Sequence, residues 1–231
     1  MSRRAELAAG LASVRERIDA ARASAGRDDE VGLVVVTKFF PASDVRLLAD
    51  LGVREVGENR HQEAEAKAAE CADLDLVWHY IGALQSNKAA AVARYAGVVE
   101  SLDRTKLVRG LDRGAAERGS PLDVLVQVSL DPPGAEHRAG AAPDDVPALA
   151  QAVEDSEHLR LRGLMAVAPL GEDPRAAFDR LARVREHLLA DHPQADRLSA
   201  GMSGDLEQAV AAGATHVRVG SAILGSRPAV R

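Results

Sequence analysis

Short β-rich runs alternate along the chain with longer segments in which apolar residues recur at helical spacing. Residues 3–24 have helical spacing and are followed by Gly26, a residue type that often ends helices. Residues 31–38 are apolar and β-branched almost throughout, which indicates a strand that is buried on both faces. Pro41 then opens a second helical segment that runs through Leu51.

The same alternation continues through the rest of the chain. It predicts further strands at 54–58, 77–81, 98–101, 122–129, 161–167, 197–200 and 216–220, which makes eight with the first. Helical spacing fills the segments 60–71, 85–95, 103–118, 144–156, 174–191 and 204–212. Parallel strands need long connections, so this order predicts a parallel sheet with crossover helices. Eight such units favour an α/β fold, a closed (β/α)8 TIM barrel with an additional N-terminal helix, and an open doubly wound sheet is the alternative.

The composition narrows the class of protein. The 231 residues carry a formal net charge of −6, which argues against a nucleic-acid-binding surface. No linker rich in proline, serine and glycine divides the chain, and Pro132–Gly134 is predicted to be a loop insertion, so we expect a single domain over 1–231. The single cysteine, Cys71, excludes an intrachain disulfide. Charged residues near the N-terminus and the lack of a run of about 20 apolar residues predict a cytoplasmic protein without membrane insertion.

Lysine is rare in this chain. Of the 29 basic residues only Lys38, Lys67, Lys88 and Lys106 are lysines. Lys38 directly follows a buried apolar run, and burial lowers the pKa of an amine toward the range where the neutral nucleophile is populated. A neutral amine at a strand end could condense with an aldehyde. The alternative is an ordinary solvated lysine.

Two glycine-bearing segments follow the last two predicted strands. They are Ser199–Asp205 and Arg218–Gly225. Glycines let backbone N–H groups approach an anion, helix N-termini add partial positive charge, and these loops bind phosphate in many barrels. Turn formation and helix capping are the alternative for each loop alone. Ser226 and Arg227 stand where a nucleotide-binding P-loop needs lysine and Ser/Thr, and no zinc motif occurs, so neither a P-loop nor a metal is expected.

A reactive lysine and a phosphate cradle at one barrel mouth suit an aldehyde that carries a phosphate. Pyridoxal 5′-phosphate (PLP) has both groups. Several segments then strengthen this interpretation: Val36–Pro41, Gly57–Asn59 followed by Gln62–Glu63, Trp78–Lys88, Ser101–Arg104 and Leu161–Met165. With these motifs, over nearly its whole length, the chain resembles the YggS/PROSC family of pyridoxal phosphate homeostasis proteins.

The resemblance implies a barrel like that of alanine racemase (PLP fold type III), with PLP held as a Schiff base on Lys38. It sets Arg218 against the pyridine nitrogen and Asn59 near the ring substituents. His79 carries over as a residue of the barrel rim, and a packed, hydrogen-bonded histidine is the alternative. The residues it places around the phosphate are Met202, Ser203, Gly220 and Ser221.

The chain departs from the family pattern at two places. Ser129-Leu130 stands where an Asn-Ile-like pair is usual, and Arg138-Ala139-Gly140 stands where Lys-x-Gly is usual. We therefore expect no accessory role for a second lysine in that loop. The cofactor site proper is unaffected by either change.

Arg218 also bears on catalysis. An arginine that faces the pyridine nitrogen stays protonated and donates a hydrogen bond, which leaves the ring a weak electron sink. Racemases of this barrel type take a second base, a tyrosine, from a separate C-terminal β-domain, and neither Tyr80 nor Tyr95 belongs to such a domain in a chain ending at Arg231. The leading hypothesis is a monomeric PLP carrier that stores, buffers or delivers the cofactor, with PLP-dependent apoenzymes as candidate recipients.

Two enzyme hypotheses remain beside the carrier. One is a small amino-acid racemase or other PLP-dependent enzyme. The other is a barrel enzyme that acts on another phosphorylated metabolite, with Lys38 as an aldolase-type amine.

Overall fold

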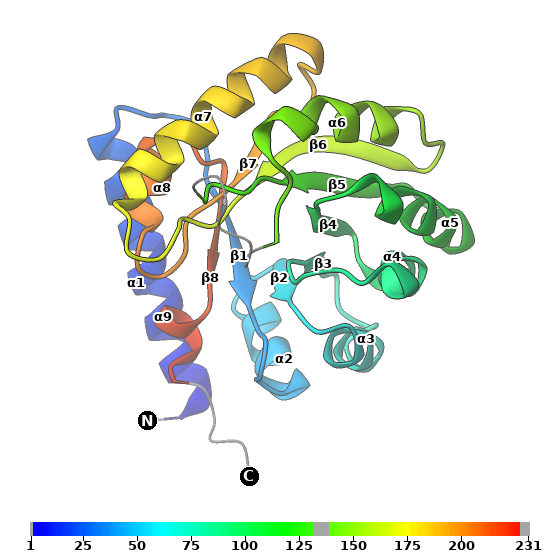
Figure 1. Ribbon diagram of the computed structural model, residues 1–231. Coiled ribbons are helices and arrows are strands. Elements are labelled where there is room, and N and C mark those ends of the chain that lie inside the picture. Colours follow the sequence, from blue (N-terminus) through cyan, green and yellow to red (C-terminus); the bar gives the residue numbers. More distant parts are fainter. Residues whose placement is uncertain (1, 132–138, 227–231) are drawn as a thin grey trace.

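A closed barrel of eight parallel strands forms the centre of the molecule (Figure 1). The structure is a computed structural model that describes residues 2–131 and 139–226. Neighbours in the barrel follow the order of the sequence, and β1 pairs with β8 to close it. This confirms the predicted barrel and excludes the open sheet. The strands are β1 (Gly32–Val36), β2 (Glu55–Glu58), β3 (Val77–Tyr80), β4 (Val98–Leu102), β5 (Leu122–Gln127), β6 (Leu159–Met165), β7 (Arg197–Ser199) and β8 (His216–Val219).

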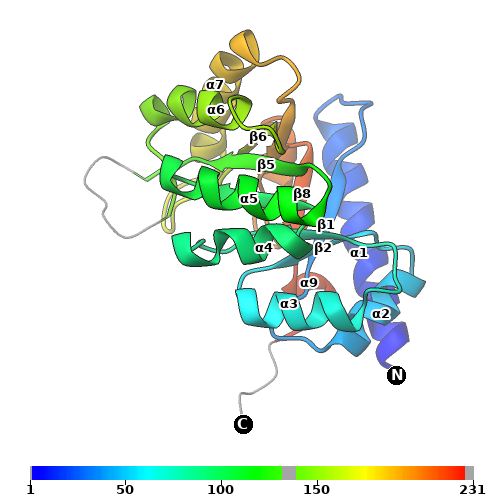
Figure 2. The ribbon, with the colours of Figure 1, turned by 90° about the vertical axis from the view of Figure 1, so that its right-hand side faces the viewer.

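Helices surround the barrel, and one more precedes it. The additional N-terminal helix lies against α8 and α9 beside β8 and β1 (Figure 1). After a rotation of 90° about the vertical axis, α3, α4 and α5 are seen side by side on the outside of the barrel (Figure 2). The helices are α1 (Arg3–Ser24), α2 (Ala42–Asp50), α3 (His61–Glu70), α4 (Ala89–Tyr95), α5 (Val108–Arg118), α6 (Val146–Glu154), α7 (Pro174–Asp191), α8 (Leu206–Ala211) and α9 (Ser221–Leu224).

The structure differs from the predicted elements mainly at their ends. The helices predicted to begin at 85, 103 and 144 each open with a 3-10 turn, at Ser86–Lys88, Thr105–Leu107 and Pro143–Asp145. The sixth strand begins two residues before the predicted start at 161. Helix α9 was not predicted, because four residues are too few for a helical periodicity to be visible. None of the helices among the described residues is long and apolar enough to cross a membrane.

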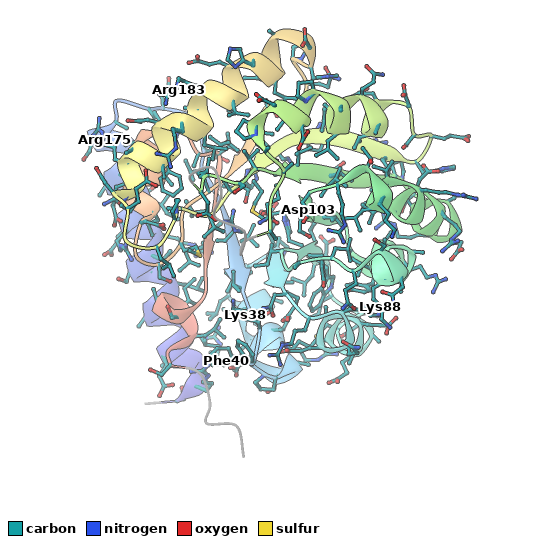
Figure 3. The ribbon with its side chains drawn as sticks, in the orientation of Figure 1. Lys38, Phe40, Lys88, Asp103, Arg175 and Arg183 are labelled. Carbon is teal, nitrogen blue, oxygen red and sulfur yellow. The ribbon has the colours of Figure 1, made fainter. Side chains whose placement is uncertain are left out.

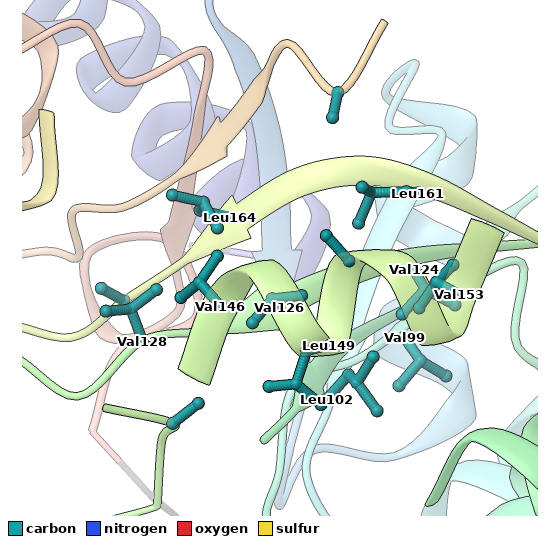
Figure 4. Close-up of a cluster of buried hydrophobic side chains, with 14 of the residues drawn as sticks. Val99, Leu102, Val124, Val126, Val128, Val146, Leu149, Val153, Leu161 and Leu164 are labelled. Atoms are coloured by element: carbon teal, nitrogen blue, oxygen red, sulfur yellow. The ribbon is translucent and has the colours of Figure 1, made fainter. Parts of the chain in front are cut away.

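The apolar core lies mostly between the barrel and the helices. Around β4, β5 and β6 it contains Val99, Val124, Leu161 and the inward face of α6 (Figure 4). Around β1 and β8 it contains Val35, Val217 and one face of α1. Because successive side chains of a strand point to opposite faces, the other half of each strand faces the barrel interior. There Val98, Leu125 and Met165 form a small separate cluster.

Polar residues share the barrel interior with these apolar side chains. His79, Glu100, Ser199 and Arg218 lie on β3, β4, β7 and β8, and each is at most 3% exposed. Interiors of such barrels are usually filled by branched apolar side chains. These four polar residues therefore indicate that this part of the barrel interior has a role other than packing.

Candidate functional site

A cavity of about 270 Å³ opens at the carboxyl ends of β1 and β8. It brings together six of the eight residues predicted for the cofactor site and leaves out Asn59 and His79. Its lining comprises Val36, Lys38, Phe39, Phe40, Ile81, Met202, Ser203, Gly204, Arg218, Gly220, Ser221 and Gly225. Lys38 and Arg218 are the ionisable side chains among these described residues.

Lys38 lies in a tight turn that starts directly after β1 (Figure 3). The Phe40 N–H donates to the Thr37 carbonyl over 3.1 Å, which closes a four-residue turn with Lys38 second and Phe39 third. Phe39 has a φ of 71°, and it is the only non-glycine residue with positive φ in the described part of the chain. Turns with positive φ at the third position usually have glycine or asparagine there, so this turn is strained.

A buried ion cluster on α3 and β2 contacts the backbone on both sides of Lys38. The Lys67 ammonium donates to the Thr37 carbonyl (2.8 Å), Glu58 Oε1 (2.7 Å) and Glu63 Oε1 (2.7 Å). Glu63 Oε1 also accepts the Phe39 N–H over 2.6 Å. We call Thr37, Glu58, Glu63 and Lys67 the Lys67 cluster.

Within the Lys67 cluster, burial dominates at Glu58. It raises the pKa of Glu58, and the hydrogen bonds from Lys67 and Thr37 offset only part of this effect. The Thr37 hydroxyl donates to Glu58 Oε1 over 2.7 Å. Glu58 Oε2 has no hydrogen-bond partner among the described residues.

The two glycine-bearing segments meet at the opposite wall of the cavity. The Ser221 hydroxyl donates to the Ser203 hydroxyl oxygen over 3.2 Å, and the Ala222 N–H points to the same oxygen at 3.4 Å. The N–H groups of Ser203 and Gly204 meet no acceptor within residues 2–131 and 139–226. At Gly220 a Cβ would approach the Val36 carbonyl oxygen to 3.0 Å, so a side chain there would crowd the cavity wall.

The donors of this wall are individual groups rather than a long helix dipole. Helices α8 and α9 have six and four residues. The Met202 N–H already donates to Asp205 Oδ1 over 2.6 Å, so it is not one of the donors open to an anion. Met202 therefore contributes its side chain to this wall. Hydroxyls and open N–H groups of this kind suit an anion with several oxygens, such as a phosphate.

Arg218 lines the cavity, and hydrogen bonds to neighbouring groups fix its guanidinium. Its Nη1 donates to Ser199 Oγ (2.7 Å) and its Nη2 to the Ala166 carbonyl (2.9 Å). Glu100 Oε2 lies 3.7 Å from Arg218 Nη1 and accepts the Ser199 hydroxyl over 2.6 Å. Burial lowers the pKa of Arg218, and the Glu100 carboxylate counteracts this.

His79 completes this arrangement from β3. Its Nδ1 lies 2.7 Å from Glu100 Oε1, which fixes a proton on Nδ1 as donor to the carboxylate. Burial opposes ionisation of Glu100, but His79, Arg218 and Ser199 outweigh it and lower the pKa of Glu100 to about 2. We call His79, Glu100, Ser199 and Arg218 the Glu100 cluster.

The expected rim position of His79 is wrong. The residue lies within β3, one position before the strand ends, and its side chain points into the barrel interior. The alternative, a packed and hydrogen-bonded histidine, describes it. It reaches the cavity only through Glu100 and Arg218.

Asn59 follows β2 and does not line the cavity. Its backbone carbonyl lies so close to Gly82 that no side chain would fit at position 82. Its side-chain oxygen Oδ1 is buried and without a hydrogen-bond partner among the described residues.

Other sequence features lie apart from the cavity. Ser129 and Leu130 border a second hollow with Leu170 and Glu172, and Met202 and Gly204 belong to both. Arg138 lies outside the described residues, as does the Pro132–Gly134 stretch.

No role at the site was predicted from the sequence for Glu58, Glu63, Lys67 or Glu100. The available signal was a carboxylate inside an otherwise apolar strand, which buried strands tolerate only with a partner.

Comparison with known proteins identifies the family of this chain. The profile of the alanine racemase N-terminal domain matches residues 10–228. A pyridoxal phosphate homeostasis protein of Mycobacterium leprae is 45% identical, with 96% of this chain and 93% of that protein covered. PipY of Synechococcus elongatus, whose structure has PLP bound, is 37% identical with a TM-score of 0.82, covering 95% of this chain and all (100%) of that one.

A crystal structure from Bifidobacterium adolescentis has the same fold, with a TM-score of 0.86 and 34% identity over 96% of this chain and 95% of its own. The family profile and these relatives confirm the barrel type inferred from the sequence motifs. The chain belongs to the family of pyridoxal phosphate homeostasis proteins, built on the N-terminal barrel of alanine racemase.

Proposed function

We propose that this protein binds PLP as a Schiff base on Lys38 and holds it for storage, buffering or delivery in PLP homeostasis. The observation that carries the proposal is one cavity lined by the Lys38 turn on one side and the Ser203 and Ser221 hydroxyls on the other. The PLP bound to PipY and the similarity to pyridoxal phosphate homeostasis proteins support it.

The residues of the cavity fit this cofactor. Ser203 and Ser221, with the open N–H groups beside them, would hold the phosphate, while Gly220 lets this segment pass close to the Val36 carbonyl. Arg218 would donate a hydrogen bond to the pyridine nitrogen from a position fixed by Ser199 and Glu100. The cofactor supplies an aldehyde that amines can bind and exchange.

A carrier without committed turnover is the role we favour. Racemisation needs acid and base groups on both faces of the reacting carbon. Among the described residues that line the cavity, Lys38 is the only group suited to proton transfer at neutral pH, because arginine stays protonated. Burial raises the pKa of Tyr80 and Tyr95, and neither lines the cavity.

Borohydride reduction of the PLP-loaded protein, followed by peptide mass mapping, tests the proposal. The label is expected on the peptide that contains Lys38, and Lys38→Ala is expected to lose both the label and the visible absorbance. Lys106→Ala is the matched control, because Lys106 is an exposed lysine far from the cavity in sequence. Labelling of another lysine, or of none, contradicts the proposal.

A second measurement separates the carrier from a racemase. The carrier predicts little exchange of an amino acid's α-proton with solvent deuterium. Rapid exchange with one amino acid would favour the racemase instead. Protein without any affinity for PLP would favour the aldolase-type enzyme.

We further propose that residues 1–231 act as one domain, as a cytoplasmic monomer that passes PLP to apoenzymes. The exposed mouth supports transfer, because Met202 is 39% exposed beside the cavity. Sedimentation analysis of the loaded protein tests the monomer, and activation of an apoenzyme faster than by free PLP tests transfer.

A further inference from the structure

The Lys67 cluster does not line the cavity, and two of its hydrogen bonds hold the backbone of the Lys38 turn on either side of Lys38. One goes from Lys67 to the Thr37 carbonyl, and the other from the Phe39 N–H to Glu63. These residues immediately precede and follow Lys38. The same Glu63 oxygen accepts from Lys67, so one ion pair of α3 holds both flanks of the lysine.

The geometry points to a positioning role: we propose that the Glu63–Lys67 pair of α3 imposes the strained turn at Phe39 and thereby directs the Lys38 amine into the cavity. This inference rests on the proposed function of Lys38. It assigns to Lys67 and Glu63 a role in cofactor attachment without contact to the cofactor.

Backbone strain at Phe39 makes the proposal specific. L-residues with a β-carbon avoid positive φ, and such conformations persist only where the surroundings enforce them. Here the Phe39 N–H is fixed by a carboxylate at 2.6 Å, and that carboxylate is fixed by Lys67 at 2.7 Å. Released from them, Phe39 would relax to negative φ, and the direction of the preceding Lys38 side chain would change with it.

Burial makes the cluster suited to this task. Lys67 is 6% exposed and Glu58 is 1% exposed, so water competes little for their hydrogen bonds. Glu58 contributes by holding the Lys67 ammonium and the Thr37 hydroxyl on one oxygen. The turn is therefore attached to the barrel through β2 and to α3 at once.

The test measures how fast PLP attaches to Lys38 in the full-length chain, by borohydride trapping at successive times and peptide mapping. Lys67→Met and Glu63→Ala are each expected to slow attachment by about tenfold, since a displaced reacting group loses much of its rate. Lys106→Met is the matched control and should leave the rate unchanged. Thermal unfolding of each variant without PLP verifies that it is folded.

Rescue at position 39 distinguishes positioning from general support of the fold. Glycine and asparagine accept positive φ readily. Phe39→Gly or Phe39→Asn, added to Lys67→Met, should restore most of the lost rate, whereas the same changes in the parent chain should accelerate attachment little. In the absence of PLP, Glu63→Ala should speed deuterium exchange of the Phe39 amide.

The outcomes separate the two hypotheses. If the parent chain does not attach PLP at Lys38, the proposed function fails. If the parent attaches it but folded Lys67→Met and Glu63→Ala match its rate, or slowed variants are not rescued at position 39, the positioning role is wrong. If Lys67→Met does not fold, Glu63→Ala decides alone, because Glu63 is only half-buried and lies on a helix that tolerates alanine.

Discussion

The Lys67 cluster and the Glu100 cluster are two solutions to the problem of burying a carboxylate beside the same cavity. Glu58 and Glu100 are each 1% exposed and lie on β2 and β4. Yet the pKa of Glu58 is raised and that of Glu100 is lowered to about 2. Equal burial therefore does not decide the ionisation of a buried acid.

The difference comes from the number of donors per carboxylate. Glu100 alone receives His79, Ser199 and the charge of Arg218, which use both of its oxygens. Glu58 shares one ammonium with Glu63, and its second oxygen has no partner among the described residues. The cost of desolvation is offset where a carboxylate has hydrogen-bond donors of its own. It dominates the pKa where two carboxylates share the same donor.

The largest expected effect follows from removing the charge of Glu100. Glu100→Gln leaves Arg218 buried without its counter-ion, and we expect it to lower the free energy of unfolding by about 3 kcal/mol. Urea denaturation at pH 7 measures this. Glu58→Gln is the matched comparison, and an equal or larger loss there would break the contrast between the clusters.

The pH dependence of stability should have opposite signs for the two acids. For Glu100 the folded pKa lies below the ordinary value of 4.5, so its contribution is present above pH 4.5 and is lost as the pH falls toward about 2. The loss amounts to about 3 kcal/mol at most. For Glu58 the folded pKa is raised, so its contribution is present at low pH and is lost as the pH rises through that pKa.

Denaturation of the parent, Glu100→Gln and Glu58→Gln chains between pH 2 and pH 7 checks both signs. The gap between parent and Glu100→Gln should narrow toward low pH. A gap that stays constant would show that Glu100 is not the titrating group.

A smaller effect is expected from the bridge between Arg218 and Glu100. Ser199→Ala removes a hydroxyl that donates to Glu100 and accepts from Arg218, at a cost of about 1–2 kcal/mol. It should also weaken PLP binding, because Arg218 loses one of its supports. Titration of PLP by absorbance measures this, with Ser156→Ala as control, since Ser156 only caps the end of α6.

The smallest effect is expected at Glu58. Glu58→Gln keeps an acceptor for Thr37 and leaves Glu63 to balance Lys67, so stability at pH 7 should change by less than about 1 kcal/mol. A small change there beside a large one at Glu100 would establish the contrast. Chemical denaturation of both variants in one buffer gives it directly.

Local patterns in the sequence determined most of the architecture. The periods of apolar residues predict strands and helices because each is set within a window of several to some twenty residues. The eight strands, the first helix and the barrel all follow from them. Lys38 and the two glycine-bearing segments were placed at the same rim because the carboxyl ends of parallel strands share one face.

Only the tertiary structure decided which charges meet. Glu100 and Ser199 are 99 positions apart, and Lys67 lies 30 positions from the Thr37 carbonyl that it binds. Such pairs depend on strand register, barrel closure and which face of α3 turns inward, and no local pattern encodes these. The same holds for the positive φ of Phe39, since distant partners impose it against local preference.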